Sequence, residues 1–169
     1  NIEGDIVEGG VHWGYGILIE LLLSNKHINA FDSFEGHSTP TTEDLASKNW
    51  KPLDSSFKVS ENDAFKTLMI GSDLSKKQIN NRVTFYKGWI QETMKAWSEE
   101  MHQKGSKIAY VHADMDIYQP IKTILNTTFP LLSLGGIVCV GIIDNPELQG
   151  KTIAFNEFLS SIDKSLIEK

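Results

Sequence analysis

Short apolar runs alternate with helical patterns along the chain, and this alternation restricts the possible fold more than any other feature. The runs of strand length cover residues 4–10, 27–34, 83–88, 107–114 and 135–143. The helical patterns cover residues 15–25, 63–70, 89–103, 118–132 and 152–162. Apolar strands that alternate with helices are typical of a parallel sheet covered on both faces. We therefore predict an α/β fold with a doubly wound, mainly parallel sheet of about five strands.

Composition and charge exclude several classes of protein. Of the 169 residues, 40% are hydrophobic and 22% are charged, as in an ordinary globular domain. The formal net charge of −6 and the scattered lysines argue against a nucleic-acid partner. No apolar run reaches the length of a membrane span. We expect a single domain over residues 1–169 in a cytoplasmic, reducing compartment, with the one cysteine, Cys139, in the core.

The carboxyl ends of the strands are where a ligand is expected, because doubly wound sheets bind ligands outside these ends. One connection there is unusually long. Residues 33–62 are mostly polar, contain Pro, Ser and Thr, and follow directly on the second strand. A connection of this length is usually functional or disordered. We favour the interpretation that this segment forms a lid that covers the substrate.

The stretch VEGGVHWGYG, residues 7–16, joins the first strand to its helix, which is apolar nearly all round and therefore predicted to be buried. Glycines let backbone N–H groups approach a ligand closely. The dinucleotide fingerprint is G-x-G-x-x-G, whereas here three residues separate Gly10 from Gly14, and Glu8 precedes them. A carboxylate suits the sulfonium cation of S-adenosylmethionine and would repel a pyrophosphate. The alternative is a tight turn that only packs the helix on the sheet.

An acidic residue ends the second strand at a position that suits ribose binding. Asp32 follows Gly10 by about 20 positions, as the acid of a nucleotide-binding fold does. One carboxylate can accept hydrogen bonds from both hydroxyls of a diol. The alternative is an aspartate that caps a turn. Together the two elements indicate an adenosine-containing cofactor, and they do not separate NAD from S-adenosylmethionine.

Three polar residues alternate at the end of the fourth strand, in HADMD. His112, Asp114 and Asp116 share one side of an extended strand. The two carboxylates suit a divalent cation or the deprotonation of a hydroxyl. The alternatives are a helix cap for Asp116 and, favoured for His112, a structural role in the core.

Six blocks in order carry a resemblance over nearly the whole chain: GDIVEGGV, AFDSFEG, VTFYKGWIQETM, HADMDIYQPIKTIL, FPLLSLGGIVCV and NPELQGKTIAFNEFL. They resemble the macrocin O-methyltransferase family of class I S-adenosylmethionine-dependent methyltransferases. The resemblance implies a Rossmann-like sheet, S-adenosylmethionine as methyl donor, and methylation of a hydroxyl on a small molecule such as a sugar or natural product. It also implies dependence on Mg²⁺, which grips vicinal oxygens of the substrate.

The resemblance also assigns roles by position. It places Glu8 and Gly10 at the methionine end, Asp32 at the ribose, Ser33 and Phe34 beside the adenosine, and Gly88 and Trp89 at the adenine. Gly9 and Gly14 of the same turn complete the predicted cofactor-binding residues. It makes Asp114 the first metal ligand and Asp116 a neighbour close to the substrate. With His112, which shares their side of the strand, these are the predicted catalytic residues: His112, Asp114 and Asp116.

One departure from the family pattern concerns the metal. The family usually ends the fifth strand with an Asp-Asp pair, and here Gly141 and Ile142 stand in those places. Neither offers the oxygen ligand that Mg²⁺ requires. Asp144 lies close in sequence and would need a shift of register to replace them. The predicted metal ligands are therefore Asp114 and Asp144, in a site that looks altered beside a well-preserved cofactor site.

Four functions remain open. The first is a metal-dependent O-methyltransferase. The second is a metal-independent one, in which orientation does most of the work and His37, His112 or Asp116 takes the hydroxyl proton. The third is a non-catalytic cofactor-binding protein, and the fourth, disfavoured by the glycine spacing, is an NAD-type oxidoreductase. The resemblance also implies helices before the first strand and two further strands after the last helix. We therefore expect an incomplete domain, and the resemblance implies a homodimer.

Overall fold

The computed structural model describes residues 2–47 and 58–166, and a five-stranded sheet forms its centre. The strands are β1 (Asp5–Gly9), β2 (Ile28–Asp32), β3 (Val83–Lys87), β4 (Ile108–Ala113) and β5 (Leu132–Val140). Their order in the sheet is β3-β2-β1-β4-β5, and every neighbouring pair is parallel. The order reverses at β1, so the connections after β1 and β3 pass over opposite faces. The predicted α/β, doubly wound fold is confirmed.

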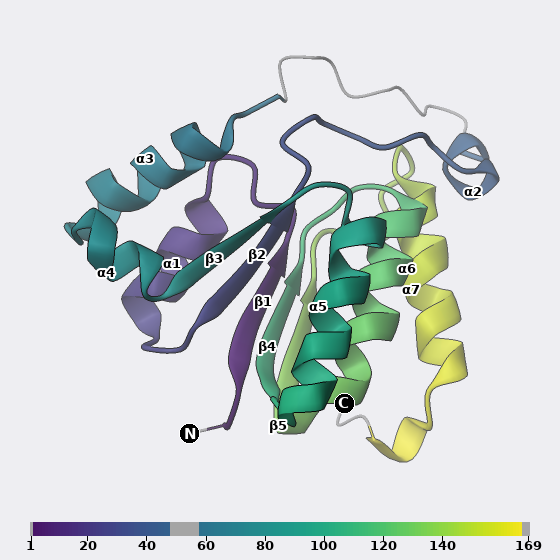
Figure 1. Ribbon diagram of the computed structural model, residues 1–169. Helices are drawn as coiled ribbons and strands as arrows, with labels where there is room; N and C mark the ends of the chain where they lie inside the picture. Colours follow the sequence, from purple (N-terminus) through teal and green to yellow (C-terminus); the bar gives the residue numbers. More distant parts are fainter. Residues whose placement is uncertain (1, 48–57, 167–169) are drawn as a thin grey trace.

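Helices cover both faces of the sheet, as predicted (Figure 1). One face carries α1 (Tyr15–Leu23), α3 (Glu61–Ser72) and α4 (Lys76–Asn80). The other carries α5 (Ile90–Lys104), α6 (Tyr118–Thr128) and α7 (Gln149–Ser161). The short α2 (Thr42–Leu45) and the 3₁₀ turns η2 (Phe129–Leu131) and η3 (Lys164–Leu166) complete the list. Within the described ranges, no helix has the length and apolar character needed to cross a membrane.

Each face of the sheet has its own apolar core, because successive strand residues point to opposite faces. Under α5, α6 and α7 the core is aromatic: the Phe31 ring stacks on Tyr86 at 4.6 Å and meets Trp97 edge-on at 5.3 Å. Under α1, α3 and α4 the core is mainly aliphatic and centres on residues such as Ile17 and Leu68. Burial of this apolar surface is the main stabilising contribution.

Three local expectations differ from the structure. The helix α1 is not buried all round, because one side of it faces solvent and leaves Leu22 60% and Leu23 82% exposed. Cys139 is exposed rather than in the core, because β5 is the edge strand of the described sheet. Pro130 follows the end of α6 and stands inside the 3₁₀ turn, so the helix is shorter than the pattern suggested.

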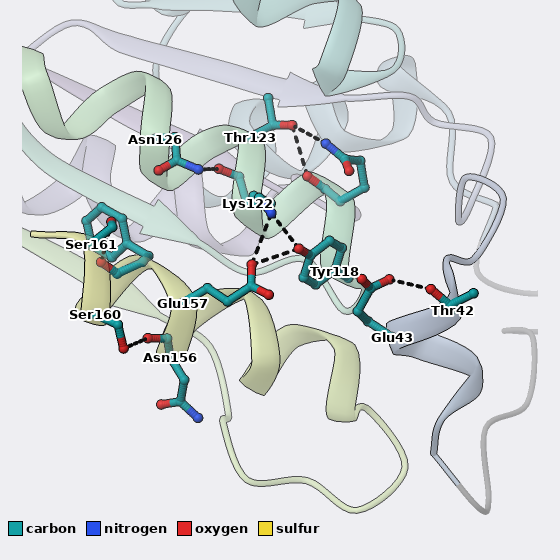
Figure 2. A network of polar contacts seen from close by, with 12 residues as sticks. Thr42, Glu43, Tyr118, Lys122, Thr123, Asn126, Asn156, Glu157, Ser160 and Ser161 are labelled. Atoms are coloured by element: carbon teal, nitrogen blue, oxygen red, sulfur yellow. Dashed lines mark hydrogen bonds and ion pairs between the residues drawn. The ribbon is translucent and has the colours of Figure 1, made fainter.

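A polar network links the side chains of α6 and α7. In Figure 2, the Tyr118 hydroxyl donates to Glu157 Oε2 at 2.7 Å, and Lys122 Nζ donates to the same oxygen at 3.0 Å. The pair is exposed, so its contribution to stability is small. The two helices pack side by side over a shared apolar core, and the amino end of α7 lies near the carboxyl ends of the strands (Figure 1).

The long segment of residues 33–62 contains α2 and the start of α3. Its central part, residues 48–57, lies outside the described residues, so the predicted lid stays a prediction. Residues of the described parts on either side line a cavity at the carboxyl ends of the strands: Ser33, Phe34, Gly36, His37, Ser38 and Val59.

Candidate functional site

A cavity of about 260 Å³ opens beyond the carboxyl ends of β1, β2 and β4. Two groups of predicted site residues line it together. The predicted cofactor residues in its wall are Gly10, Asp32, Ser33, Phe34 and Trp89. The predicted catalytic residues in its wall are Asp114 and Asp116. Their meeting at one cavity agrees with the rule that doubly wound sheets bind ligands where the strand order reverses.

The glycine turn after β1 is held against the neighbouring strands. Gly10 N–H donates to the Phe31 carbonyl at 3.0 Å, and Asp114 N–H donates to the Gly9 carbonyl at 2.9 Å. Gly10 has φ 90°, and a Cβ there would overlap the Asp114 carbonyl. Only glycine meets both conditions without strain. The backbone at the cavity wall is therefore close to β4 and free of side-chain atoms at this point.

Asp32 presents a fixed carboxylate at the cavity. Its Oδ2 accepts from His12 N–H at 2.9 Å, and its Oδ1 accepts from Phe34 N–H at 2.7 Å. Both donors have positive φ values, 49° and 55°, that turn their N–H groups to the carboxylate. Each oxygen keeps acceptor capacity for a further hydrogen bond. The carboxylate is thus oriented in advance for two hydroxyl donors of a ligand.

Apolar and aromatic side chains form another part of the wall. Gly88 N–H donates to the Asp32 carbonyl at 3.0 Å with φ 141°, and the chain then turns so that Trp89 lines the cavity. Phe34 lines it from the end of β2. Aromatic faces of this kind suit a planar base.

Asp116 is held at both of its oxygens. His37 Nε2 lies 3.3 Å from Oδ2, and Lys151 Nζ donates to Oδ1 at 3.2 Å. Burial acts to raise the pKa of Asp116, but the hydrogen bond from His37 and the Lys151 ammonium outweigh it and hold that pKa below its usual range. Asp116 is therefore an ionised carboxylate at neutral pH, in contact with an imidazole that also lines the cavity.

A second polar cluster lies behind the glycine turn and does not line the cavity. Glu8 is 1% exposed, and its Oε2 lies 3.3 Å from His112 Nδ1. Burial raises the pKa of Glu8, and the hydrogen bond with Glu8 raises the pKa of His112. Burial and the neighbouring Glu8 carboxyl raise the pKa of Glu20 to about 9. At neutral pH a protonated carboxyl of Glu20 faces Glu8.

The structure thus separates the predicted site residues into two sets. The residues that do not line the cavity are Glu8, Gly9, Gly14, Gly88, His112 and Asp144. The first five support the turn or the strand ends, and Asp144 is exposed, with its N–H donating to Thr152 Oγ1 at 2.9 Å. The roles of all these residues remain predictions.

Two polar residues of these clusters were not predicted. Lys151 is 2% exposed although α7 has a solvent-exposed side, where a lysine usually lies. Glu20 is 8% exposed in the middle of α1. An acid inside an apolar helix was the one available signal for Glu20, whereas the sequence offers none for Lys151.

The residues present do not fit a magnesium ion at Asp114. A side chain at Gly141 would overlap Asp114 Oδ1, and the Lys151 ammonium lies 3.4 Å from the place of its Cβ. In the described part of the chain, the one set of three acidic, histidine or cysteine side chains with metal-binding spacing is Glu8, Glu20 and His112, whose ligand atoms lie within 4.8 Å of one another. That set does not include Asp114 or Asp144.

Solved structures share this fold. CalS11, a calicheamicin methyltransferase, superposes with a TM-score of 0.73 and 24% identity over 91% of this chain and 63% of that chain. The O-methyltransferase NovP superposes with a TM-score of 0.68 and 24% identity over 95% of this chain and 64% of that chain. This chain therefore spans less than two thirds of the length of either one. At this level of identity the likeness shows the fold.

The family is shown by a family model rather than by these superpositions. A search of curated proteins found no match. The model of the macrocin O-methyltransferase (TylF) family matches residues 1–165, which is nearly the whole chain. The chain therefore belongs to the macrocin O-methyltransferase family.

Proposed function

We propose that this chain is the core of an S-adenosylmethionine-dependent O-methyltransferase that acts on a hydroxyl of a small molecule such as a sugar or natural product. The observation that carries the proposal is that Asp32 and Asp116 line the same cavity, so that groups suited to binding a nucleoside lie beside groups able to accept a proton. Membership of the family supports the reaction class. CalS11 and NovP, which share the fold, are methyltransferases by name.

The cofactor wall fits S-adenosylmethionine better than a dinucleotide. The Asp32 carboxylate, fixed by two N–H groups, would accept from the ribose hydroxyls. Gly10 leaves the backbone bare for the methionine end, and Phe34 and Trp89 offer apolar contact for the adenine. When bound, the cofactor supplies a methyl group on a cationic sulfur, which an oxygen nucleophile takes in line as the carbon–sulfur bond breaks. No lysine or arginine stands among the described lining residues to neutralise a pyrophosphate.

The proton-accepting wall is built around His37. Its Nε2–H donates to Asp116, which fixes the tautomer and leaves Nδ1 as an acceptor. Nδ1 has no hydrogen-bond partner within the described residues and is covered from solvent in this structure, so the ring has to turn toward the cavity before Nδ1 can accept a proton. A histidine oriented by a carboxylate is the usual arrangement of a general base. In the proposed reaction His37 Nδ1 takes the proton of the acceptor hydroxyl, while that oxygen forms its bond to the methyl carbon.

The test is methyl transfer from labelled S-adenosylmethionine to a panel of sugars and phenols. We expect label in a product, and His37→Gln is expected to lower turnover by about 100-fold, because general-base catalysis contributes factors of this size. His102→Gln, at an exposed histidine in the last turn of α5, is the matched control and keeps full turnover. Binding of the cofactor without transfer to any acceptor contradicts the catalytic role of the chain. Binding of NAD in its place contradicts the cofactor assignment.

A further inference from the structure

A buried ammonium stands beside the carboxylates of the cavity. Lys151 lies in the first turn of α7 and is 2% exposed, and its Nζ lies 3.2 Å from Asp116 Oδ1. Burying a lysine charge costs several kcal/mol unless the charge is paired. Asp116, whose other oxygen contacts His37, supplies that pairing. Lys151 thus provides a positive charge inside the protein at the end of β4.

The same ammonium borders the space next to Asp114. Gly141 follows β5, and its N–H donates to the Ala113 carbonyl at 3.0 Å, which holds the backbone close to β4. A Cβ at Gly141 would overlap Asp114 Oδ1 and would lie 3.4 Å from Lys151 Nζ. An aspartate at this position, as the family pattern has it, would therefore collide with Asp114 in its present orientation. The space between Asp114 and the end of β5 is bordered by a cation instead.

The amino end of α7 is held in place by contacts other than the ion pair. Asp44 is 1% exposed, and its Oδ1 accepts from Tyr118 N–H at 2.8 Å at the start of α6. Gly150 packs so closely on the same carboxylate that a Cβ there would overlap it. The network of Tyr118, Lys122 and Glu157 joins α6 and α7 further along (Figure 2). The backbone at Lys151 is therefore held in place by the protein itself, and the position of this residue does not depend on a ligand.

We propose that the Lys151 ammonium takes the place of the divalent cation that the family resemblance implies, so that this site works without a metal. Lys151 is a positioning residue: it holds the Asp116 carboxylate, which in turn orients His37. A divalent cation next to this ammonium would be repelled by it. The catalytic part of this inference rests on the proposed function, whereas the exclusion of the metal does not.

The exclusion is tested without cofactor or substrate, by adding Mn²⁺ to the chain and following the free ion by electron paramagnetic resonance. Each protein is compared with the same protein carrying Asp114→Asn, so that ions bound at Glu8, Glu20 and His112 cancel. We expect the unaltered chain to bind no Mn²⁺ in an Asp114-dependent way up to about 1 mM. Lys151→Met, which keeps the length and removes the charge, is expected to gain Asp114-dependent binding at least about tenfold tighter.

Lys151→Arg keeps the charge and is expected to behave like the unaltered chain. Circular dichroism shows whether Lys151→Met folds. If it does not fold, Lys151→Arg and the unaltered chain still test the proposal through their Mn²⁺ binding. Asp114-dependent binding of Mn²⁺ by the unaltered chain or by Lys151→Arg overturns the proposal, and so does a folded Lys151→Met that gains none. A second measurement adds a chelator to the methyl-transfer assay: unchanged turnover is expected, and a loss restored by Mg²⁺ overturns the proposal. Failure to detect methyl transfer at all would count against the proposed function and leave the Mn²⁺ result as it stands.

Discussion

Lys151 Nζ donates to Asp116 Oδ1 at 3.2 Å, across the junction between α7 and the end of β4. Since His37 lies 3.3 Å from the other oxygen, the carboxylate is held from two sides by groups that come from distant parts of the sequence. Its orientation is therefore set before any ligand arrives. This arrangement places an ionised carboxylate and an imidazole together in the wall of the cavity that Asp32 also lines.

The pairing of Lys151 with Asp116 predicts a result that depends on both partners. Asp116→Asn leaves a buried ammonium without its counter-charge, so we expect the free energy of unfolding to fall by about 3 kcal/mol. Turnover is expected to fall by about 100-fold, because His37 loses the carboxylate that orients it. The double variant Asp116→Asn with Lys151→Met is expected to regain much of the stability and none of the turnover. Urea unfolding and methyl-transfer rates measure the two effects, and equal recovery of both would contradict this account.

Asp32 is expected to contribute to cofactor binding and little to the reaction itself. Asp32→Ala removes the acceptor for two ribose hydroxyls, so the affinity for S-adenosylhomocysteine should fall by about 30-fold or more. Calorimetry gives the affinity, and Asp73→Asn is the matched control. Asp73 ends α3 in a left-handed conformation that asparagine also adopts, away from the cavity lining. An affinity that Asp32→Ala leaves unchanged would remove this residue from the site.

The Glu8 carboxylate occupies the space in which a side chain at Gly16 would lie. A Cβ at Gly16 would lie 2.5 Å from Glu8 Oε2 and 2.7 Å from Oε1. Gly16→Ala should therefore destabilise the fold by about 1–3 kcal/mol, although alanine favours a helix more than glycine does. Gly105→Ala is the comparison: there the space is open and only the positive φ, 62°, is unfavourable. Thermal unfolding should show the larger loss for Gly16→Ala, and a stabilised Gly16→Ala would show that Glu8 is free to move.

The raised pKa of Glu20 predicts how the free energy of unfolding depends on pH. Its pKa is about 9 in the folded chain against 4.5 as the reference value, so the folded state binds the proton more tightly. The stability contribution is complete below pH 4.5, declines as the unfolded chain ionises, and is lost once the pH has passed about 9. Glu20→Gln keeps a hydrogen-bond donor toward Glu8 and removes the ionisable group. It should therefore make the fall of stability with pH less steep and raise the free energy of unfolding by about 1–2 kcal/mol near pH 8.

Unfolding by urea across this pH range checks the prediction for Glu20. Glu99→Gln, at an exposed position of α5, is the control and should leave the pH dependence as it is. A Glu20→Gln variant whose stability declines with pH as steeply as that of the unaltered chain would show that Glu20 ionises normally.

The fold was largely predictable because its signals are local. Each strand is an apolar run between turn residues, and the parallel arrangement follows from the helices between the runs. The exceptions have physical reasons. The five-residue α4 depends on a capping box between Ser75 and Gln78 and carries too few apolar residues to show a period. The exposed side of α1 could not be foreseen, because an apolar pattern does not say which face has a neighbour.

The cavity was predictable where its residues end strands and not where they come from helices. Gly10, Asp32 and Asp114 follow apolar runs, so their meeting at one edge of the sheet follows from the topology. Lys151 lies 35 positions from Asp116 on α7, and only the tertiary packing of that helix turns it inward. The replacement at Gly141 was visible in the sequence, whereas the cation beside it was not.

Calorimetric titration of the chain of residues 1–169 with S-adenosylhomocysteine tests the central claim most directly, because that claim is the binding of this cofactor in the cavity beside Asp32. We predict saturable binding at one site per chain, weakened by about 30-fold or more in Asp32→Ala, together with no binding of NAD. An absence of heat at about 1 mM S-adenosylhomocysteine, from a chain shown to be folded, would contradict it.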